Sequence, residues 1–416
     1  MQMPNSPAVN RGNYLTWLEE SSKSKLIKTV VGFRRSGKSY LLKMFVKQLT
    51  ESGRAIRNNI FYLNFENDLL TDIKTVSDLR KVWELYLREI AVPRTSIYII
   101  WDEIQLVKSW EKLVRALYET GEYNIFLTGS NSKLLSGELS GSLSGRTIEL
   151  SIAPFDFKEY LEYLKLNQKD YYSNKHEIDK AFVRYLRRGG LAEQFDLNDD
   201  LAASYKDGLV QKIILDDIAK RYQIDKIKTL QNVFQFISGN ITSTISLRKI
   251  AGRLKNQGVE VSPSTLDNYI YYWETSYAVS KLTKFDYKLS RVFDRTAKYY
   301  IVDNLFVAGR EESDEKRLEN LVYNELVRRH QKENIHFGSE ENGHEVDFVV
   351  NKNGKFLLYQ VCLNLNENNI KREMGSLNIA GRNLGGEREI LVLERDIEST
   401  TNISITPIIG WLTSAG

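Results

Sequence analysis

The sequence predicts an α/β fold for residues 1–155, built on a parallel sheet with crossover helices. Short apolar runs alternate there with segments of helical periodicity, which is the pattern of successive β-α-β units. Residues 97–101 (IYIIW) form a nearly continuous apolar run, as expected for a strand that is covered on both faces. A glycine-rich turn at residues 32–37 separates the first strand from an amphipathic helix.

Several strands, with helices between them, are expected in this first region. The first strand leads through the glycine-rich turn to a helix with apolar residues at helical spacing from Leu41 to Leu49. A second helix is expected over residues 79–90. The strands are expected at residues 26–31, 60–65, 97–101, 125–128 and 147–152, the last ending before Pro154.

After Pro154 the chain becomes mainly helical. Residues 156–210 are aromatic and helical, with a break at Gly189-Gly190. Residues 211–292 are helical and then short and strand-like. Within them, Ser262-Pro263 is typical of a helix start, because serine caps a helix N-terminus and proline fits its first turn.

The last region, residues 293–416, returns to an α/β pattern. It contains a helix over residues 317–330 and an Asn353-Gly354 pair, which is typical of a two-residue hairpin turn. Apolar strands are expected at residues 346–350, 356–361 and 390–393.

Length and composition narrow the class of protein. At roughly 150 residues per domain, 416 residues correspond to two to four domains. The excess of 58 basic over 54 acidic residues is small, so binding to DNA requires local clusters of basic side chains. The single cysteine excludes an intramolecular disulfide framework and a cysteine-based zinc site, and the four scattered histidines argue against a catalytic zinc cluster. The low cysteine content is typical of a reducing compartment, and no apolar run reaches the roughly 18 residues of a membrane helix. We therefore expect a cytoplasmic protein.

Residues 32–39 (GFRRSGKS) match the phosphate-binding pattern G-x-x-x-x-G-K-S/T. The glycines let backbone N–H groups face a phosphate, and the following helix presents its positive end to the same anion. We expect Lys38 to bridge the β- and γ-phosphates of ATP, and the Ser39 hydroxyl to bind Mg²⁺. The expected nucleotide contacts are Gly32, Arg34, Arg35, Ser36, Gly37, Lys38, Ser39 and Tyr40.

An acidic pair, Asp102-Glu103, follows the apolar run 97–101. Ligands of open α/β sheets bind at the carboxyl ends of strands, where this pair is delivered. Asp102 is expected to hold Mg²⁺, and Glu103 to polarise the attacking water as a general base. Taken alone, the pair is equally compatible with a helix cap at a strand end; the phosphate loop upstream favours the catalytic interpretation.

Six segments in order carry a family resemblance: GFRRSGKS, IIWDEIQ, LTGSNSKLLS, LSGR, IAPFDFKEYL and RGGLAEQF. They resemble the AAA+ (additional-strand) group of P-loop ATPases, and most closely prokaryotic AAA+-type proteins with a C-terminal nuclease-like domain of unknown function. The resemblance covers nearly the whole chain. It implies an AAA+ P-loop ATPase core (1–155), a helical lid (156–210), a winged-helix-like domain (211–292) and a restriction-endonuclease-like α/β domain (293–416).

The resemblance also implies further catalytic residues. Asn131 matches sensor 1, a polar side chain that orients the hydrolytic water, with Ser130 and Thr128 as alternatives and a plain turn as the other interpretation. Arg146 resembles the arginine finger that reaches the γ-phosphate of a neighbouring subunit, which requires a homo-oligomer; an ordinary surface arginine is equally compatible. The sensor 2 arginine stays unassigned, although Arg187-Arg188 lie near the glycine break.

Residues 246–254 and 262–276 look like a helix-turn-helix pair, and the resemblance implies a winged-helix module with its wing near residues 281–288. The second helix carries a packing stripe and no basic residue, so DNA binding and protein docking both stay open. The basic residues that would contact phosphates are Arg248, Lys249, Arg253, Lys255, Lys281, Lys284 and Lys288.

The resemblance implies the PD-(D/E)xK nuclease fold for residues 293–416, in which acidic groups bind Mg²⁺. The residues at the metal-binding positions are Glu319 or Glu325, Asp347 and Gln360. Cys362 stands where the family has a lysine, and a buried thiol behaves as a small hydrophobe. Lys371 or Arg372 would supply charge only from another direction. We therefore expect the fold with weak or no nuclease activity.

The expected function is that of an ATP-binding and ATP-hydrolysing switch or motor that acts on DNA. One alternative is a nucleotide-gated signalling or defence switch that acts on a protein partner. The other is an ATP-regulated nuclease. Stimulation of ATP hydrolysis by DNA favours the first, stimulation only by a protein favours the second, and metal-dependent cutting separates the third.

Overall fold

The computed structural model describes residues 9–130, 143–166, 171–285, 296–309, 313–339, 344–396 and 403–414. The chain divides into two compact units. Unit 1 comprises Met1–Ala153 with Thr275–Tyr277, and unit 2 comprises Pro154–Glu274 with Ala278–Gly416. In the described ranges, no helix combines the length and the apolar character that crossing a membrane requires.

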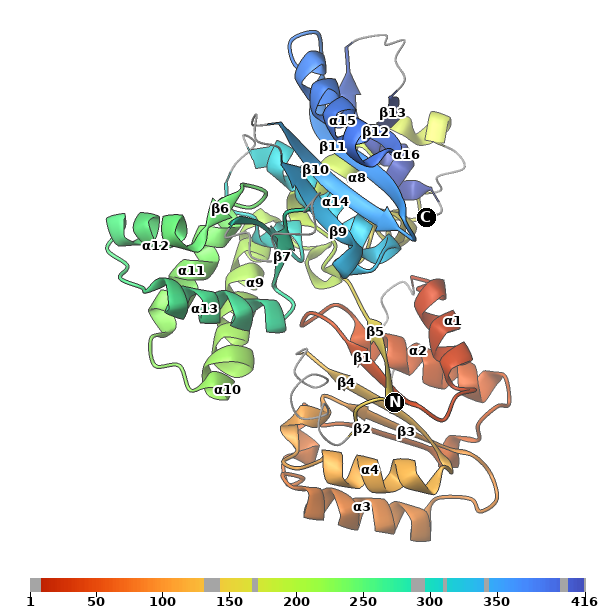
Figure 1. The fold of residues 1–416 in the computed structure, drawn as a ribbon. Helices are drawn as coiled ribbons and strands as arrows, with labels where there is room; N and C mark the ends of the chain where they lie inside the picture. The colour runs from red at the N-terminus through yellow and green to blue at the C-terminus, as the bar shows by residue number, and fades with distance from the viewer. Residues whose placement is uncertain are drawn as a thin grey trace. The chain divides into compact units, whose positions relative to one another are not determined.

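Unit 1 is built on a five-stranded parallel sheet with the order β2-β3-β4-β1-β5 (Figure 1). β4 lies between β1 and β3, so the carboxyl ends of these three strands lie next to one another. The strands are β1 (Ile27–Val31), β2 (Ile60–Asn64), β3 (Ile97–Asp102), β4 (Tyr123–Gly129) and β5 (Thr147–Ser151).

Helices cover both faces of this sheet, which explains why β3 is apolar along its whole length. Side chains alternate between the faces of a strand. Ile99 and Trp101 pack in a core with α3 and α4, whereas Tyr98 and Ile100 pack in a core with α1 and α2. The helices are α1 (Gly12–Ser21) and α2 (Lys38–Glu51) on one face, and α3 (Val76–Glu89) and α4 (Glu111–Thr120) on the other.

The predicted α/β class and parallel sheet are confirmed. Each expected strand overlaps an observed one; β3 extends to Asp102, and β4 begins at Tyr123, two residues earlier than expected. α1 and α4 were not predicted. α4 buries Leu113, Val114 and Leu117 at helical spacing, a pattern that the sequence carries but that the prediction left out.

Unit 2 contains a second five-stranded sheet, with the order β13-β12-β11-β10-β9. β9, β10 and β11 are antiparallel neighbours, whereas β11, β12 and β13 are parallel. Asn353 (φ 54°) and Gly354 (φ 85°) form the expected hairpin turn between β10 and β11. The strands are β9 (Ile335–Ser339), β10 (Glu345–Lys352), β11 (Lys355–Leu365), β12 (Glu387–Arg395) and β13 (Ser404–Pro407).

The two faces of this sheet pack on different helices. Leu377 of α15 (Ile370–Leu384) packs with Val349 and Leu358 on one face. The other face forms one core with four helices, and two of these, α7 and α8, come from the segment 156–210 that was expected as a lid. The four helices are α7 (Phe157–Tyr163), α8 (Tyr171–Arg188), α14 (Asp314–Arg329) and α16 (Ile408–Thr413).

The middle of unit 2 is helical and carries an antiparallel three-stranded sheet with the order β6-β8-β7. The Ser262 hydroxyl accepts a hydrogen bond from Thr265 N at 3.1 Å and caps α13, as its Ser-Pro start predicts. The elements are α9 (Asp199–Lys212), a π-helix (Ile213–Ala219), α10 (Lys220–Tyr222), α11 (Ile227–Gly239), β6 (Ile245–Ser246), α12 (Leu247–Asn256), α13 (Pro263–Thr275), β7 (Val279–Thr283) and β8 (Thr296–Ile301). Short 3-10 helices lie at Arg57–Asn59, Asp68–Leu70, Ile104–Leu106, Ala192–Gln194, Asn304–Phe306 and Lys332–Asn334.

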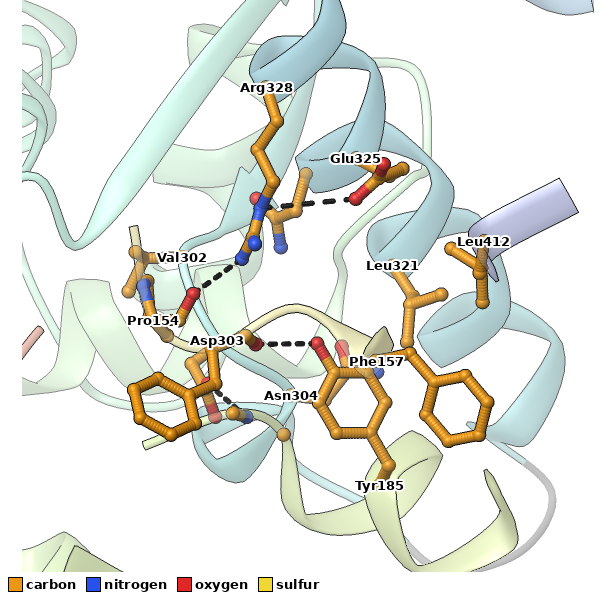
Figure 2. Close-up of a pocket in the computed structure, with 14 residues that line it drawn as sticks. Pro154, Phe157, Tyr185, Val302, Asp303, Asn304, Leu321, Glu325, Arg328 and Leu412 are labelled. Carbon is orange, nitrogen blue, oxygen red and sulfur yellow. Dashed lines mark hydrogen bonds and ion pairs between the residues drawn. The ribbon is translucent and has the colours of Figure 1, made fainter. Parts of the chain in front are cut away.

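The glycine pair after α8 forms a close-packed corner of unit 2. A Cβ at Gly190 would lie 1.9 Å from Phe155 O, and one at Gly189 would lie 1.8 Å from Asp303 Oδ1. Gly190 N donates a hydrogen bond to Asp303 Oδ2 at 2.7 Å. Beside this corner is a cavity of about 20 Å³, lined in part by Asp303 and Tyr185 (Figure 2). This cavity has room for about one water molecule and is too small for a nucleotide.

Candidate nucleotide site

The phosphate loop joins the end of β1 at Val31 to the start of α2 at Lys38. Gly32 has φ 141°, and a Cβ there would lie 2.2 Å from Ile152 O, so only glycine fits. Gly37, with φ 95°, also has a backbone that other residues rarely adopt. Because the loop opens directly into a helix N-terminus, its N–H groups and the helix dipole favour an anion at this place.

Lys38 is held inside the loop and is 4% exposed. Its Nζ donates hydrogen bonds to Gly32 O at 3.0 Å and Phe33 O at 3.2 Å. The nearest carboxylate oxygen, Glu103 Oε1, lies 3.7 Å away. The ammonium group is thus positioned mainly by neutral carbonyl groups, so its positive charge is available for phosphate oxygens.

Asp102, at the end of β3, is fully buried and is held by hydroxyl groups. Thr128 Oγ1 donates to its Oδ1 at 2.5 Å, Tyr62 OH donates to its Oδ2 at 2.9 Å, and the Ser39 hydroxyl is also hydrogen-bonded to it. Burial raises the pKa of Asp102, although these hydrogen bonds oppose the rise. Among the described residues no cation pairs with this carboxylate. A divalent cation beside Ser39 and Asp102 therefore fits the chemistry of the site.

Glu103 follows Asp102 in a left-handed conformation, with φ 56° and ψ 45°. Such a conformation is uncommon outside glycine and clusters at functional sites. It turns the side chain toward the end of β4, where Ser130 N donates to Glu103 Oε2 at 3.2 Å. Gln105 Nε2 donates to the same oxygen at 2.5 Å. Glu103 is 6% exposed and is oriented by fixed donors, as a general base must be.

Thr128 joins the two acidic residues. Its hydroxyl donates to Asp102 and accepts from Glu103 N at 2.8 Å. Thr128 was an alternative for the sensor 1 role, and Ser130 contacts Glu103 through its backbone N–H. Asn131, the preferred sensor 1 residue, lies outside the described residues, so its role stays a prediction.

Arg146 lies just before β5 in unit 1. Its NH1 is 3.5 Å from Glu119 Oε1, and its guanidinium lies over the Tyr118 ring, 5.5 Å from the ring centroid. The side chain is 37% exposed. These contacts place the residue at the surface, and its action on a neighbouring subunit stays a prediction.

The other expected nucleotide contacts also lie on the loop or the first turn of α2. Arg34 NH1 pairs with Glu66 Oε1 at 2.6 Å. Arg35 has φ 69° and is exposed, Ser36 is buried, and Tyr40 is half-buried. The structure therefore brings Lys38, Ser39, Asp102 and Glu103 together, with the remaining loop residues around them.

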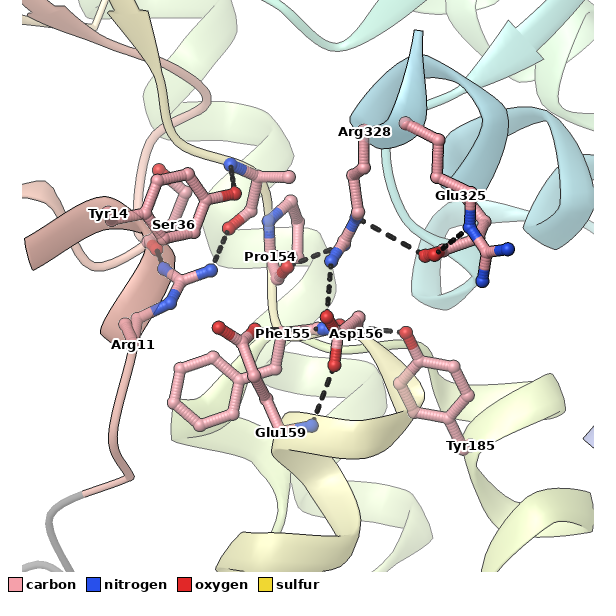
Figure 3. A network of polar contacts seen from close by, with 12 residues as sticks. Arg11, Tyr14, Ser36, Pro154, Phe155, Asp156, Glu159, Tyr185, Glu325 and Arg328 are labelled. Carbon is pink, nitrogen blue, oxygen red and sulfur yellow. Dashed lines mark hydrogen bonds and ion pairs between the residues drawn. The ribbon is translucent and has the colours of Figure 1, made fainter. Parts of the chain in front are cut away.

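Arg11, which precedes α1, was missed by sequence reasoning. Its NH1 donates to Ser36 O and its NH2 to Ala153 O, both at 2.9 Å (Figure 3). Its guanidinium also lies over the Tyr14 ring, 4.6 Å from the centroid. One buried guanidinium thus connects the backbone of the phosphate loop to the segment that follows β5.

Tyr62 and Gln105 were missed as well. Gln105 lies two residues beyond Glu103 in the segment IIWDEIQ, so its nearness to the general base was a usable signal. Tyr62 lies in β2, which pairs with β3 so that Asn64 stands beside Asp102. The phenol hydroxyl of Tyr62 in this mainly apolar strand was a weaker signal.

In unit 2, only part of the expected acidic set comes together. Glu319 Oε1 and Asp347 Oδ1 lie 3.0 and 3.3 Å from Lys298 Nζ. Glu325 instead pairs with Arg329 at 2.7 Å. Glu319, and not Glu325, is therefore the acidic residue that α14 contributes to this cluster. Lys298 lies on β8, outside every pattern in the sequence, and was missed.

The other residues expected here are neutral or paired elsewhere. Gln360 is buried, and its Oε1 has no hydrogen-bond partner among the described residues. The Cys362 thiol donates to Asn364 O at 3.1 Å, and burial raises the pKa of Cys362 to about 11. Arg372 pairs with the adjacent Glu373, and Lys371 is exposed.

The expected basic residues of the middle region are mostly on one helix. Arg248, Lys249, Arg253 and Lys255 are exposed on α12, and Lys281 and Lys284 are half-buried. Lys288 lies outside the described residues. The sensor 2 candidates are both paired in unit 2: Arg187 with Asp314 at 2.9 Å and Arg188 with Asp199 at 3.0 Å.

Three family models match the chain. Residues 24–161 match the family described as AAA domain, which spans the phosphate loop and the Asp102-Glu103 pair. Residues 179–308 and 315–408 match two domains of unknown function, DUF8612 and DUF4143. The chain therefore carries an AAA-type P-loop domain.

Two relatives match along most of their length. An uncharacterized protein of Haemophilus influenzae is 31% identical over 410 residues, covering 97% of this chain and 98% of the relative. The uncharacterized protein MJ1544 of Methanocaldococcus jannaschii is 33% identical over 359 residues, covering 84% of this chain and 77% of the relative. Among solved structures, the Walker-type ATPase PABY2304 of Pyrococcus abyssi aligns at 18% identity with a TM-score of 0.48, covering 72% of this chain and 95% of that one.

Proposed function

The chain belongs to the same family as these uncharacterized proteins of Haemophilus influenzae and Methanocaldococcus jannaschii, and we propose that it is an ATP-hydrolysing AAA+-type switch or motor that acts on DNA. One observation carries the ATPase part. Two distant segments meet, because Lys38 Nζ lies 3.7 Å from Glu103 and the Ser39 hydroxyl is hydrogen-bonded to Asp102. This is the arrangement that hydrolysis of a nucleoside triphosphate needs.

Each residue has a physical role in this proposal. The loop N–H groups and Lys38 neutralise the phosphates, and the buried position of Lys38 strengthens that interaction. Glu103, fixed by Gln105 and Ser130 N, orients and deprotonates the attacking water. Mg²⁺, held by Ser39 and Asp102, would supply Lewis-acid stabilisation of the phosphate oxygens.

The DNA part of the proposal is supported by charge and by the order of elements in the middle of unit 2. Residues 227–301 run helix, strand, helix, helix, strand, strand (α11, β6, α12, α13, β7, β8), with β8 central in the small sheet. This order of elements, with its small antiparallel sheet, supports the proposal that the region is a winged-helix module. The four exposed basic side chains on α12 offer contacts to phosphates.

An ATPase assay with and without single- and double-stranded DNA, across protein concentration, tests this function. We expect stimulation by DNA that falls steeply with salt. Lys249→Ala/Lys255→Ala on α12 is expected to weaken DNA binding and to flatten its salt dependence. Lys47→Ala/Lys112→Ala, which removes two exposed charges from unit 1, is the matched control. Stimulation that is equal in both double variants would refute the assignment to α12.

The oligomer part of the proposal has a separate test. If Arg146 acts on a neighbouring subunit, Arg146→Ala subunits keep an intact loop, and Lys38→Ala subunits keep an intact Arg146. Mixing the two inactive variants is then expected to restore part of the ATPase activity. Mixtures as inactive as either variant alone would contradict action between subunits.

A protein partner is the second candidate function, and one observation favours it. α13, which follows α12, exposes Asp267, Asn268 and Tyr271 and presents no basic side chain. An exposed aromatic residue beside polar ones is better suited to contact a protein partner than the phosphate backbone of DNA. ATPase activity that ignores DNA and rises only with a purified protein partner would replace the first proposal by this one.

A further inference from the structure

Lys298 lies at the centre of three carboxylates in unit 2. Its Nζ is 2.7 Å from Glu345 Oε1, 3.0 Å from Glu319 Oε1 and 3.3 Å from Asp347 Oδ1. Lys298 is 1% exposed and comes from β8, whereas Glu345 and Asp347 begin β10 and Glu319 lies on α14. Three elements of unit 2 therefore converge on one ammonium group.

All three carboxylates of the cluster have further hydrogen-bond donors besides Lys298. An ammonium group has three donors, and three carboxylate oxygens surround this one. Each carboxylate also accepts from a second donor, which fixes its orientation. These second bonds are Tyr300 OH to Glu319 Oε1 at 2.7 Å, Val361 N to Asp347 Oδ2 at 2.9 Å, and Thr244 Oγ1 to Glu345 Oε2 at 2.9 Å.

The nuclease resemblance implies a divalent cation among these acids, but the residues do not fit one. Mg²⁺ and Ca²⁺ need several oxygen ligands at roughly 2.0–2.6 Å, whereas the place that faces all three carboxylates holds Lys298 Nζ. Gln360 and the Cys362 thiol add no charge. Within the described part of the chain, no group of three or more His, Cys, Asp or Glu residues has an arrangement that could hold a metal ion.

Electrostatics keep this ammonium group charged. Burial alone lowers the pKa of a lysine, but the three carboxylates together raise the pKa of Lys298 well above its usual value. In turn Lys298 opposes the rise that burial causes in the pKa of Glu319 and Asp347. Each charge in the cluster thus depends on its opposite, as in other buried ion networks.

We infer that Lys298 is a built-in cation that takes the place of a divalent metal, so that the acidic cluster of unit 2 is a metal-independent structural element and not a nuclease centre. This inference does not rest on the proposed ATPase. It also differs from the simple loss of the family lysine at Cys362, because a lysine from another strand fills the cluster.

Manganese binding to the full-length protein tests the inference directly. Mn²⁺ is titrated without nucleotide and followed by electron paramagnetic resonance, in an Asp102→Asn background that removes the metal position of unit 1. We expect the titration to be unchanged when Asp347→Asn is added. A Mn²⁺ site that Asp347→Asn removes, or Mn²⁺-dependent DNA cleavage that it removes, would overturn the inference.

Lys298→Met tests the same inference by removing the ammonium group and asking whether a metal ion can replace it. Without the ammonium group the carboxylates repel one another, so in EDTA we expect the thermal midpoint to fall by roughly 10 °C. Mn²⁺ is expected to restore much of that loss in Lys298→Met and to leave the parent unchanged. Lys352→Met, an exposed lysine on β10, is the matched control and is expected to show neither effect.

Two outcomes of this second experiment are decisive. A folded Lys298→Met protein that neither binds Mn²⁺ nor is stabilised by it would show that Lys298 does not stand in a metal position. A parent protein stabilised by Mn²⁺ through Asp347 would show that the metal binds beside the lysine. If Lys298→Met does not fold, the titration of the parent and of Asp347→Asn decides alone.

Discussion

Two buried lysines of this chain lie near carboxylates, and the contacts they make differ. In unit 1, Lys38 donates to two backbone carbonyls and lies 3.7 Å from its nearest carboxylate oxygen, while Asp102 is held by hydroxyl groups. In unit 2, Lys298 lies within 2.7–3.3 Å of three carboxylates. The first site has one long ion pair, between Lys38 and Glu103, and no cation among the described residues pairs with Asp102. The second site surrounds one lysine with three carboxylates at shorter distances.

This difference shows that residue types alone do not define a binding site. Lysine and carboxylates in direct contact satisfy one another and form a structural network. The same groups held apart by carbonyls and hydroxyls keep their charge for an anion and a cation from outside. The spacing set by the backbone therefore decides which cluster binds a ligand.

The largest expected effect is on catalysis in unit 1. Glu103→Gln removes the general base but keeps the side-chain volume, so we expect the hydrolysis rate to fall by about 10²–10⁴-fold while ATP still binds. Phosphate release and binding of a fluorescent ATP analogue measure the two properties separately. Glu122→Gln, a change at an exposed residue directly before the amino end of β4, is the control. Equal turnover in Glu103→Gln and the parent would remove the assignment of the base.

Asp303 extends the comparison to a buried carboxylate held by backbone N–H groups. Burial raises the pKa of Asp303 to about 7, above the ordinary value of 3.8. Between these values the folded chain binds a proton that the unfolded chain does not, so stability falls as the pH rises from about 4 to about 7. Asp303→Asn is expected to flatten this slope by up to about 1.4 kcal/mol per pH unit.

Urea denaturation at a series of pH values measures that change. The other buried acids with raised pKa keep their own contribution in both proteins, so the difference between the two slopes belongs to Asp303. Asp200→Asn, an exposed residue at the start of α9, is the control and is expected to leave the slope unchanged. Parallel stability curves for Asp303→Asn and the parent would show that Asp303 is ionised throughout this range.

Asp102→Asn is expected to change stability and activity in opposite directions, with a stability change of intermediate size. Because burial without a paired cation raises the pKa of Asp102, replacing the carboxylate by an amide is expected to stabilise the nucleotide-free protein by about 1–2 kcal/mol. The same change removes the metal ligand and is expected to abolish hydrolysis. Denaturation and ATPase assays measure both, with Asp72→Asn as the exposed control. A less stable Asp102→Asn protein would contradict the electrostatic argument.

The smallest expected effect is that of Tyr62→Phe. It removes the hydroxyl that donates to Asp102 Oδ2 at 2.9 Å, a bond with a net contribution of about 1 kcal/mol. We expect the Mg²⁺ concentration for half-maximal ATPase activity to change by about fivefold, with little change in the maximal rate. Tyr271→Phe on α13, an exposed tyrosine, is the control. A large loss of maximal rate would instead assign Tyr62 to the chemical step.

The fold of unit 1 was largely predictable, because buried parallel strands leave a strong local pattern. Ile97–Asp102 is apolar on both faces since helices cover both faces. α4 was missed although it follows helical spacing, because it is short and lies between two strands. In unit 2 the hairpin at Asn353-Gly354 was predictable from two residues, whereas the joint packing of α7 and α8 with the second sheet depends on contacts far apart in sequence.

The residues of the candidate nucleotide site also fall into predictable local motifs and unpredictable distant contacts. The phosphate loop and Asp102-Glu103 are local patterns and were found, whereas the groups that position them come from elsewhere. Arg11 reaches Ala153 across 142 residues, and Lys298 reaches Asp347 across 49. No periodicity or motif in a single sequence marks such pairs. Asn131 and Arg146 stay predictions that the experiments above address.

Nucleotide binding is the claim on which the ATPase proposal depends most directly. Isothermal titration of the folded, full-length protein with ATP and Mg²⁺ is predicted to give saturable binding, and Lys38→Ala is predicted to lose it. Binding of equal strength in Lys38→Ala, or no uptake of nucleotide by the parent at millimolar concentration, would contradict the account.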